Sequence, residues 1–572
     1  MSEQQFDVHI ELVEDIPVII AKLERMKVQE LVGQHFVPHG NWRGCGVGQV
    51  VLVWLTYILT EGDHRLSHLQ EWVKGREKTL SACLKTEIRA EDFSDDRLEI
   101  VLDMFGNDGN WQLFDGDLTQ GIIRVYDLKG NLIRLDSTSG SGYWKVSEAG
   151  LFQFGHSKDH RPDLPQFKVM LATLDPLGLA VGIQVPSGEK ADDPLYIPAI
   201  DQVRQNLGRS GGLFFVGDCK MMAFETRLHA VAGGDGYLGP FSKTQIDDEA
   251  LAVLLKPVWD GEQPLEVIQR KGVDIAEGFE TSVELSSTHD GQEIKWIERR
   301  LVVRSYQHAH AATQALEARL SAAANDLGKL NERGRGKEHF RDVESLTNAA
   351  QAVLKKHKVE DCFRFTCEEQ TTEYQVRAYK ERPAETRTEH EVTLRFERDE
   401  PAIQQLTRLF GWRVYGTNQT AADFSLEQLV CAYRDEYLVE RNFGRLKGKS
   451  LALTPMYLQD DNRATGLIRL LSIALRALTL LEHVVRENLA KTGQKLAGVY
   501  AGNPKRETAT PKAETILRAF KNIYLTTIQV ARQTHHQTTP LNDVQTQILA
   551  LCELPANLYD MLLPNLQNPY PK

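Results

Sequence analysis

The chain has 572 residues, 42% of them hydrophobic and 8% aromatic, which excludes a globally disordered protein and allows several folding units. Seven scattered cysteines argue against a disulfide framework and for a reducing compartment, and the acidic, polar N-terminus is unlike a signal peptide. The net charge is −12, yet residues 441–572 carry 17 Lys and Arg against 9 Asp and Glu, so a local basic surface is available.

Residues 1–128 predict a helical N-terminal domain. Apolar positions recur at helical spacing after Pro17, and residues 46–59 form a strongly apolar run. Further helices are expected over 65–84 and 94–105. Such a unit suits DNA binding or dimerisation, although plain structural packing explains it equally well, and no recognition helix can be named.

Residues 129–254 predict the first part of an α/β core. Short apolar strands, a hairpin turn at Asp175-Pro-Leu-Gly and an intervening helix favour a sheet with buried strands. The expected strands cover 131–136, 167–174, 179–185 and 212–217, and the expected helix covers 197–207.

Residues 255–408 predict an insertion subdomain. Charged strands over 295–305 and 388–397 flank a polar, helix-rich stretch with helices over 311–320 and 343–356. A basic loop, Arg333-Gly-Arg-Gly-Lys337, interrupts that stretch and is either a solvated linker or a phosphate contact.

The core is expected to resume over residues 409–500, followed by a helical tail over 501–572. A helix is predicted from Leu426 to Lys447, and an apolar helix over 466–485 contains two arginines, which favours burial over a membrane span. In the tail, a helix is predicted over 512–530.

Two aspartates follow expected strands directly. Asp136 follows Leu132-Ile-Arg-Leu, and Asp218 follows Phe214-Phe-Val-Gly. Ligands gather at the carboxyl ends of strands in open α/β sheets, so two such carboxylates can share a cation. An aspartate at the end of a single strand is more often a turn or cap residue.

A third acid lies on the helix expected over 426–447. Tyr433, Glu436, Glu440, Phe443 and Lys447 fall at offsets that place them on one face. Like charges at Glu436 and Glu440 disfavour a helix by a few tenths of a kcal/mol, roughly, unless a cation lies between them. An ordinary exposed face explains the pattern about as well.

These residue types fit phosphoryl transfer on DNA. Mg²⁺ prefers oxygen ligands and few protein carboxylates, and two ions can activate an attacking oxygen and stabilise a leaving one. Asp136, Asp218 and Glu440 are the predicted catalytic and metal-binding residues. Lys447 is placed to contact a phosphate, and Tyr433 to contact the DNA backbone.

Several motifs resemble the DDE transposases of bacterial insertion sequences, in the insertion-sequence-four superfamily and nearest to its sixteen-thirty-four group. The matching segments are Leu135-Asp-Ser-Thr-Ser, Gly155-His-Ser-Lys-Asp-His-Arg-Pro-Asp-Leu-Pro-Gln166, Val216-Gly-Asp218, and the Tyr433, Glu440 and Lys447 set. Asn41-Trp-Arg-Gly and Glu61-Gly-Asp-His-Arg-Leu-Ser-His also resemble the N-terminal domain of this group. The resemblance implies an RNase H-like mixed-sheet core split by an insertion before the Glu.

The stretch at 155–166 also has a local interpretation. Lys158, His160 and Arg161 form a compact cationic group. One interpretation is that this group lies at the border of the active site and contacts DNA there. The alternative is a charged loop in which Lys158 and Arg161 pair with Asp159 and Asp163.

Two departures from the family pattern concern the site. Glu436 replaces the Arg of the third motif, and the second motif continues as Cys219-Lys220 in place of Arg-Gly. Lys220 is the candidate for the missing cation.

The resemblance implies a transposase that binds the ends of its own element, cuts there and joins the 3′ ends to target DNA with two Mg²⁺ or Mn²⁺ ions. It implies a homodimer in the DNA complex and a cytoplasmic, nucleoid-associated location without membrane. The alternatives are a decayed or domesticated DNA-binding protein and an RNase H-like nuclease that cuts without joining.

Overall fold

The computed structural model describes residues 6–334, 339–377, 383, 385–530 and 533–563, and it divides into two compact units. The first unit contains residues 1–239, 286–296 and 432–572. The second contains residues 240–285 and 297–431. All predicted site residues belong to the first unit.

The first unit holds five neighbouring strands of a mixed sheet in the order β4-β3-β2-β5-β6. The central strand, β2, is antiparallel to β3 and parallel to β5. Buried residues occupy every position of β3 and β5, as expected for strands covered on both faces. The predicted α/β class is therefore confirmed. The bounds are β2 Leu132–Ser141, β3 Gln166–Leu174, β4 Leu179–Gln184, β5 Phe214–Gly217 and β6 Gly236–Pro240.

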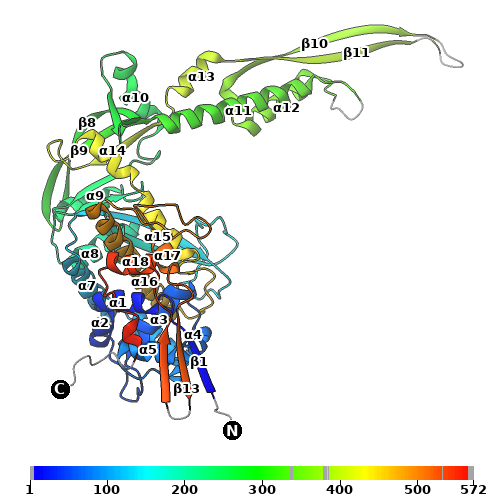
Figure 1. Ribbon diagram of the computed structural model, residues 1–572. Helices are drawn as coiled ribbons and strands as arrows, with labels where there is room; N and C mark the ends of the chain where they lie inside the picture. Colours follow the sequence, from blue (N-terminus) through cyan, green and yellow to red (C-terminus); the bar gives the residue numbers. More distant parts are fainter. Residues whose placement is uncertain (1–5, 335–338, 378–382, 384, 531–532, 564–572) are drawn as a thin grey trace. The chain divides into compact units, whose positions relative to one another are not determined.

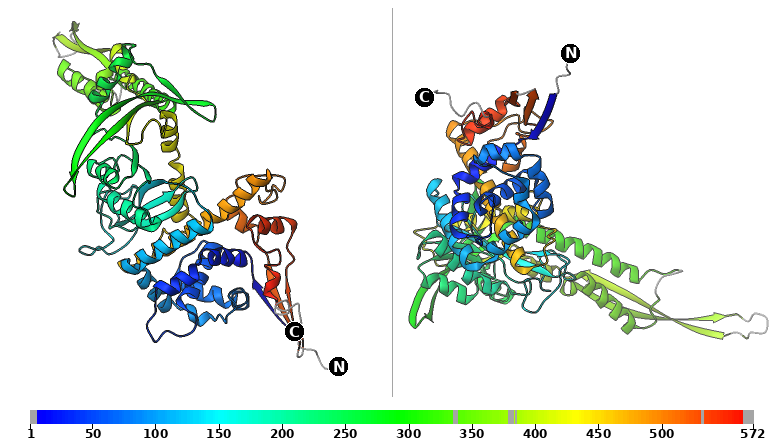
Figure 2. Two further views of the ribbon diagram at one scale, coloured as in Figure 1. Left: turned by 90° about the vertical axis from the view of Figure 1, so that its left-hand side faces the viewer. Right: turned by 90° about the horizontal axis from the view of Figure 1, so that it is seen from below.

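Helices from distant parts of the chain share the core of this unit (Figure 2). Arg476 on α16 is fully buried and pairs with Asp115 on α7, which also accepts a hydrogen bond from Asn206 on α8 at 2.7 Å. Pairing makes a buried charge tolerable, so this contact fixes how the three helices pack. The bounds are α7 Asp108–Val125, α8 Tyr196–Leu207, α9 Phe224–Ala232 and α16 Asp461–Thr492.

Helix α16 is long and apolar enough to cross a membrane by length and composition, but 94% of its most apolar 18-residue window is buried inside the molecule. That burial is typical of the core helix of a globular unit. The interpretation of this segment as a buried helix agrees with its place in the structure.

The N-terminal region is mostly helical, as predicted, but it begins with a strand. Strand β1 pairs antiparallel with β13, which in turn pairs with β14 (Figure 1). The helix predicted over 512–530 is therefore wrong beyond Arg518, because β-branched residues from Thr526 to Val530 favour a strand. The bounds are α1 Ile16–Arg25, α2 Val28–His35, α3 Val47–Glu61, α4 Leu66–Lys74, α5 Glu77–Leu84, α6 Asp95–Gly106, α17 Ala513–Arg518, α18 Asp543–Leu551, β1 Phe6–Leu12, β13 Tyr524–Val530 and β14 Gln533–Thr538.

The helix predicted from Leu426 to Lys447 is two helices, α14 Leu426–Arg434 and α15 Tyr437–Lys447. The guanidinium group of Arg134 on β2 donates hydrogen bonds to the carbonyl oxygens of Ala432 and Tyr433. The same carbonyl oxygens also accept hydrogen bonds from the backbone N–H groups of Asp435 and Glu436, three residues on, so the contact with Arg134 lies at the break between the two helices.

The second unit contains an antiparallel hairpin of two 14-residue strands, β10 and β11, with α11 and α12 packed along part of it (Figure 1). Strands β12, β9, β8 and β7 are neighbours in that order. Residues 335–337 of the predicted basic loop lie outside the described residues. The bounds are β7 Glu266–Arg270, β8 Val273–His289, β9 Gln292–Ser305, β10 Phe363–Val376, β11 Glu385–Arg398, β12 Trp412–Thr417, α10 Asp248–Trp259, α11 Tyr306–Leu330, α12 Val343–His357 and α13 Glu400–Thr407.

Candidate active site

The two predicted aspartates lie side by side on neighbouring parallel strands. Leu135 of β2 is paired in register with Gly217 of β5, and Asp136 and Asp218 are the next residues of the two strands. Both aspartates line one small cavity. The sheet register therefore brings together two carboxylates that are 82 positions apart in the chain.

Asp136 is an unusually basic carboxylate. Its pKa is raised to about 7, chiefly by burial, with Asp218 and Glu436 adding to the rise and the ammonium group of Lys158 opposing it. The backbone N–H of Ser137 donates to Oδ1 of Asp136 at 2.7 Å. A carboxylate in such a negative environment gains from a nearby cation.

Asp218 is held in place by two donors. The hydroxyl of Tyr196 donates to its Oδ1 at 2.6 Å, and the backbone N–H of Lys220 donates to the same oxygen at 2.8 Å. Tyr196 is buried, and burial together with Asp218 raises its pKa well above the usual range, so the hydroxyl keeps its proton. Tyr196 is therefore a fixed donor that orients Asp218.

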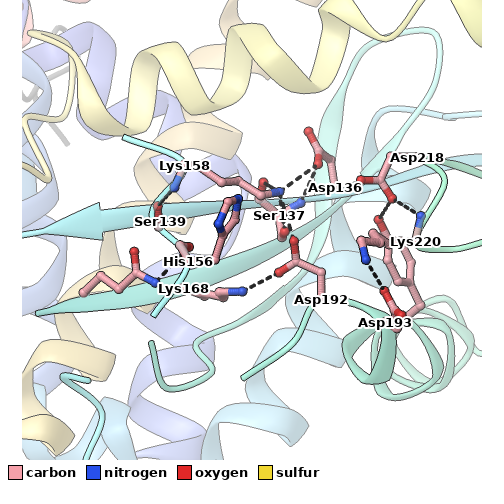
Figure 3. A network of polar contacts seen from close by, with 12 residues as sticks. Asp136, Ser137, Ser139, His156, Lys158, Lys168, Asp192, Asp193, Asp218 and Lys220 are labelled. Atoms are coloured by element: carbon pink, nitrogen blue, oxygen red, sulfur yellow. Dashed lines mark hydrogen bonds and ion pairs between the residues drawn. The ribbon is translucent and has the colours of Figure 1, made fainter. Parts of the chain in front are cut away.

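Lys158 connects Asp136 to a second acidic residue (Figure 3). Its Nζ lies 3.8 Å from Oδ1 of Asp136 and 3.5 Å from Oδ2 of Asp192, and it donates to the carbonyl and hydroxyl oxygens of Ser137 at 2.6 and 2.7 Å. Lys168 donates to Asp192 at 2.6 Å. Burial raises the pKa of Asp192, but the two lysines together hold that pKa below its usual range.

The acid that shares the cavity with the two aspartates is Glu436. The cavity has a volume of about 10 Å³ and is also lined by apolar residues such as Val216 and Val439. Glu440 is exposed, one helical turn further along α15. Within the described part of the chain, no three Asp, Glu, His or Cys side chains are arranged to hold a metal ion.

The other end of the α15 face contacts the loop that carries Lys158. Nζ of Lys447 lies 2.8 Å from Oδ1 of Asp159, the neighbour of Lys158. Glu440 stands between Glu436 and Lys447 at helical spacing, so it faces the same side of the helix. Glu436, the N-cap of α15, therefore lines the cavity of the aspartate pair, and Lys447 at the other end of the helix contacts the loop that carries Lys158.

The remaining predicted DNA contacts have varied surroundings. Arg161 pairs with Asp163 at 2.7 Å, as the charged-loop alternative predicts. That alternative is wrong for Lys158, which lies near Asp136 and Asp192 instead of the loop acids. His160 is exposed in the same loop. Nζ of Lys220 lies 3.3 Å from Asp193. Tyr433 is half-buried and lines the cavity beside Asp136.

Sequence reasoning missed Arg134, Tyr196 and Asp192. Arg134 is 3% exposed, forms a two-oxygen contact with Asp175 and holds the end of α14. A charged residue inside the apolar run Leu132-Ile-Arg-Leu was a usable signal for it. Tyr196 and Asp192 had no such signal, because only the fold brings them to the aspartates.

The comparison with solved structures gives a distant likeness. No protein-family model matches the chain, and no curated protein matches it. A solved structure described as a cryo-EM structure of the piggyBac transposase synaptic complex with hairpin DNA aligns over 97% of this chain and 87% of that chain, with 9% identity and a TM-score of 0.34. At this TM-score the likeness establishes neither a shared fold nor a shared activity.

Proposed function

We propose that this chain is a DNA transposase that binds the ends of its own element, cuts there and joins the 3′ ends to target DNA by metal-dependent phosphoryl transfer. The observation that carries the proposal is the register that sets Asp136, in the middle of β2, beside Asp218, which directly follows the parallel strand β5. The motif resemblance supplies the reaction class. In this proposal the five strands from β4 to β6 form the RNase H-like core.

The aspartate pair suits Mg²⁺ or Mn²⁺. Mg²⁺ is commonly held by one or two carboxylates, with waters and substrate phosphates as its other ligands, so an arrangement of three protein ligands is not required beforehand. The burial and the like charges that raise the pKa of Asp136 are the conditions under which a cation stabilises a carboxylate. Two bound ions would activate the attacking oxygen and stabilise the leaving one.

We propose Glu440, rather than Glu436, as the third ligand. The cavity beside Glu436 has a volume of about 10 Å³, which is roughly the space for one water and too small for a phosphate with hydrated ions. DNA must therefore approach from the solvent side, where Glu440 is exposed. Glu436 then adds negative charge behind the aspartates.

The cationic residues have separate roles in this proposal. Lys158 balances the acidic pair, and Lys447, Lys220 and the exposed loop residues His160 and Arg161 contact DNA phosphates. Tyr433 contacts the DNA backbone. Because two ends must be handled together, the active form is a homodimer on DNA, and the place of action is the bacterial nucleoid.

Cleavage of element-end DNA in Mg²⁺ tests the proposal, with Asp136→Asn and Asp218→Asn as the decisive variants. Both are expected to abolish cleavage while retaining DNA binding. Cleavage at the wild-type rate by either variant would overturn the metal assignment.

Two alternatives predict different results in the same assays. A decayed DNA-binding protein would bind the ends and show no metal-dependent nicking. A nuclease would cut but fail to join pre-cut 3′ ends to a target plasmid. Glu436 and the Cys219-Lys220 departure are the features that favour the first alternative.

A further inference from the structure

The first strand of the chain has a free edge. Strand β1 is an outer strand of the sheet β1-β13-β14 and lies beside β13 (Figure 1). All seven of its residues pair with β13 without a bulge, and in the part of the chain that the structure describes its other edge meets no strand. Proteins usually blunt such an edge with lysine, proline or a bulge, and Phe6-Asp-Val-His-Ile-Glu-Leu12 contains none of these. An edge of this kind is a template for another strand.

The outward face of β1 is apolar. Val8, Ile10 and Leu12 are 52%, 57% and 37% exposed. Residues opposite one another on paired strands share a face of the sheet. The row therefore continues across β13 as Ile528, Thr526 and Tyr524. Because the described side chains on this face carry no charge, it suits a protein surface better than DNA, which needs cations.

Glu11 fixes which face of β1 points outward. Its buried carboxylate accepts hydrogen bonds from the backbone N–H groups of Lys78 and Thr79 at 3.1 and 2.8 Å, in the first turn of α5, and from the Thr79 hydroxyl at 2.8 Å. An acid at the N-terminus of a helix is stabilising. Neighbouring residues of a strand point to opposite faces, so a shift of β1 by one residue would break these bonds. The capping contact therefore holds Ile10 and Leu12 on the exposed side.

The sequence of β1 is complementary to itself in one antiparallel register. A two-fold axis at Ile10 sets this residue opposite its own copy, Val8 opposite Leu12 of the second copy, and His9 opposite Glu11. The apolar row is then continuous across both copies. His9 and Glu11 are compatible neighbours, since they already contact each other at 3.2 Å within one chain.

The neighbouring register, with a two-fold axis at His9, is disfavoured. It sets Asp7 opposite Glu11, and like charges directly opposite each other destabilise a strand pair. Charge decides between the two registers, because both of them set apolar residues opposite apolar residues.

The contact is small on its own. Its seven residues a side compare with roughly 20–30 residues a side in a stable interface. The strand pair should therefore be weak between free chains. It should be strengthened when DNA holds two copies close together, because this raises their effective concentration.

We propose that β1 pairs with β1 of a second copy, antiparallel and with the two-fold axis at Ile10, so that two three-stranded sheets become one six-stranded sheet. The choice of a second copy rests on the proposed function, which brings two copies together on DNA. The pairing gives the free edge and the exposed apolar row a common role.

Disulfide cross-linking under a mild oxidant, with and without element-end DNA, tests the register. Directly opposite residues of antiparallel strands have Cα atoms about 4.5–5.5 Å apart, which a disulfide can bridge, whereas residues two positions out of register are too far apart. Ile10→Cys is therefore expected to form a cross-linked dimer by itself. Val8→Cys and Leu12→Cys should form a dimer when they are mixed but not when each is alone. DNA should increase the yield.

The controls use the same chain. Val37→Cys is the matched variant, because Val37 is an apolar residue that is 77% exposed in the segment after α2. The wild type, with its seven cysteines, sets the background. Addition of Ile10→Lys to the mixed Val8→Cys and Leu12→Cys chains should remove their dimer, since a lysine blocks an edge strand. A thermal melt checks that each variant is folded.

Three results overturn the inference. No dimer from Ile10→Cys, both free and on DNA, removes β1 from the contact between copies. A dimer from His9→Cys with none from Ile10→Cys replaces the proposed register with the one centred on His9. Equal cross-linking of Val37→Cys assigns the dimer to random collision.

The same preparations separate the two proposals. Metal-dependent cleavage that is lost in Asp136→Asn, together with no dimer from Ile10→Cys, would refute the strand pairing alone. A protein that never cleaves DNA, but whose Ile10→Cys variant forms the dimer, would refute the catalytic proposal alone.

Discussion

Lys158 places its ammonium group 3.8 Å from the carboxylate of Asp136, with Ser137 and Asp192 holding it there. The cation opposes the effect of burial, and the pKa of Asp136 is raised to about 7 on balance. Lys158 thus partly compensates the negative charge of Asp136 and Asp218, which links the 155–166 segment to the proposed metal site.

Replacement of Lys158 by Met is expected to raise the pKa of Asp136 and move the acid limb of the pH–rate profile for Mg²⁺-dependent cleavage upward by about one pH unit. Lys129, an exposed lysine paired with Asp127, provides the control as Lys129→Met. An unchanged acid limb in Lys158→Met would show that Asp136 does not titrate in the reaction.

Asp136 also predicts a pH dependence of stability in the absence of metal. Its folded-state pKa of about 7 lies above the unfolded value of 3.8, so the folded protein binds more protons between these values and loses stability as pH rises through that window. Asp136→Asn should remove the loss and be more stable than wild type at pH 8, by on the order of 2 kcal/mol.

Denaturant unfolding at pH 4 and pH 8 measures this difference, and added Mg²⁺ should stabilise the wild type but not the variant. Equal stabilities at both pH values would mean that Asp136 is not buried as described. Stabilisation of the variant by Mg²⁺ would locate the ion elsewhere.

Glu440 and Glu436 are predicted to differ in how much each contributes to metal-dependent cleavage. Glu440→Gln should lower metal-dependent cleavage more than about 100-fold, as loss of a ligand does, whereas Glu436→Gln should lower it about tenfold, as loss of an outer-shell acid does. Single-turnover cleavage at saturating Mg²⁺ measures both. The reverse ranking would make Glu436 the third ligand and would follow its place in the cavity.

How much of this site was predictable differs from residue to residue. Asp136 and Asp218 were found because each follows an apolar run of residues. For Asp218 that run ends the strand, whereas the strand predicted to end at Asp136 continues to Ser141. That they are neighbours depends on the parallel pairing of β2 with β5, which hydrophobic patterning does not specify. The break between α14 and α15 was missed. It coincides with a contact from Arg134, about 300 residues earlier in the chain, which no local pattern indicates.

The elements of the fold also differ in how far the sequence predicts them. The α/β class and the hairpin of β3 and β4 follow from periodicity, and the two strands were predicted to within one residue at each end. The buried helix α16 was predicted over 466–485 but extends over Asp461–Thr492. The pairing of β1 with β13 joins the two ends of the chain, and neither strand was predicted. Short strands with exposed faces carry little pattern, and their partner decides their conformation.

Tyr196 is predicted to act by positioning Asp218. Tyr196→Phe removes the hydroxyl that lies 2.6 Å from the carboxylate, and the Mg²⁺ concentration for half-maximal cleavage should rise about tenfold, as is typical when a partner of a metal ligand is lost. Tyr237→Phe is the matched control, since its buried hydroxyl accepts from Trp296 away from the aspartates. A lower rate at saturating Mg²⁺ with unchanged metal affinity would contradict a positioning role.

Lys447 is expected to exchange its ion pair with Asp159 for a DNA phosphate. The pair, with a separation of 2.8 Å, is about one-quarter to one-third exposed and contributes little to stability, so a phosphate can compete for the ammonium group. Lys447→Ala should weaken binding to element-end DNA and reduce the slope of log K against log salt by about one. Asp159→Asn should strengthen binding without changing that slope much, because the lysine is then released from its partner.

Lys491, exposed at the end of α16, serves as the control as Lys491→Ala. Equal salt slopes for Lys447→Ala and wild type would show that this lysine stays with Asp159 when DNA binds, and would leave it a structural role at the junction of α15 with the Lys158 loop.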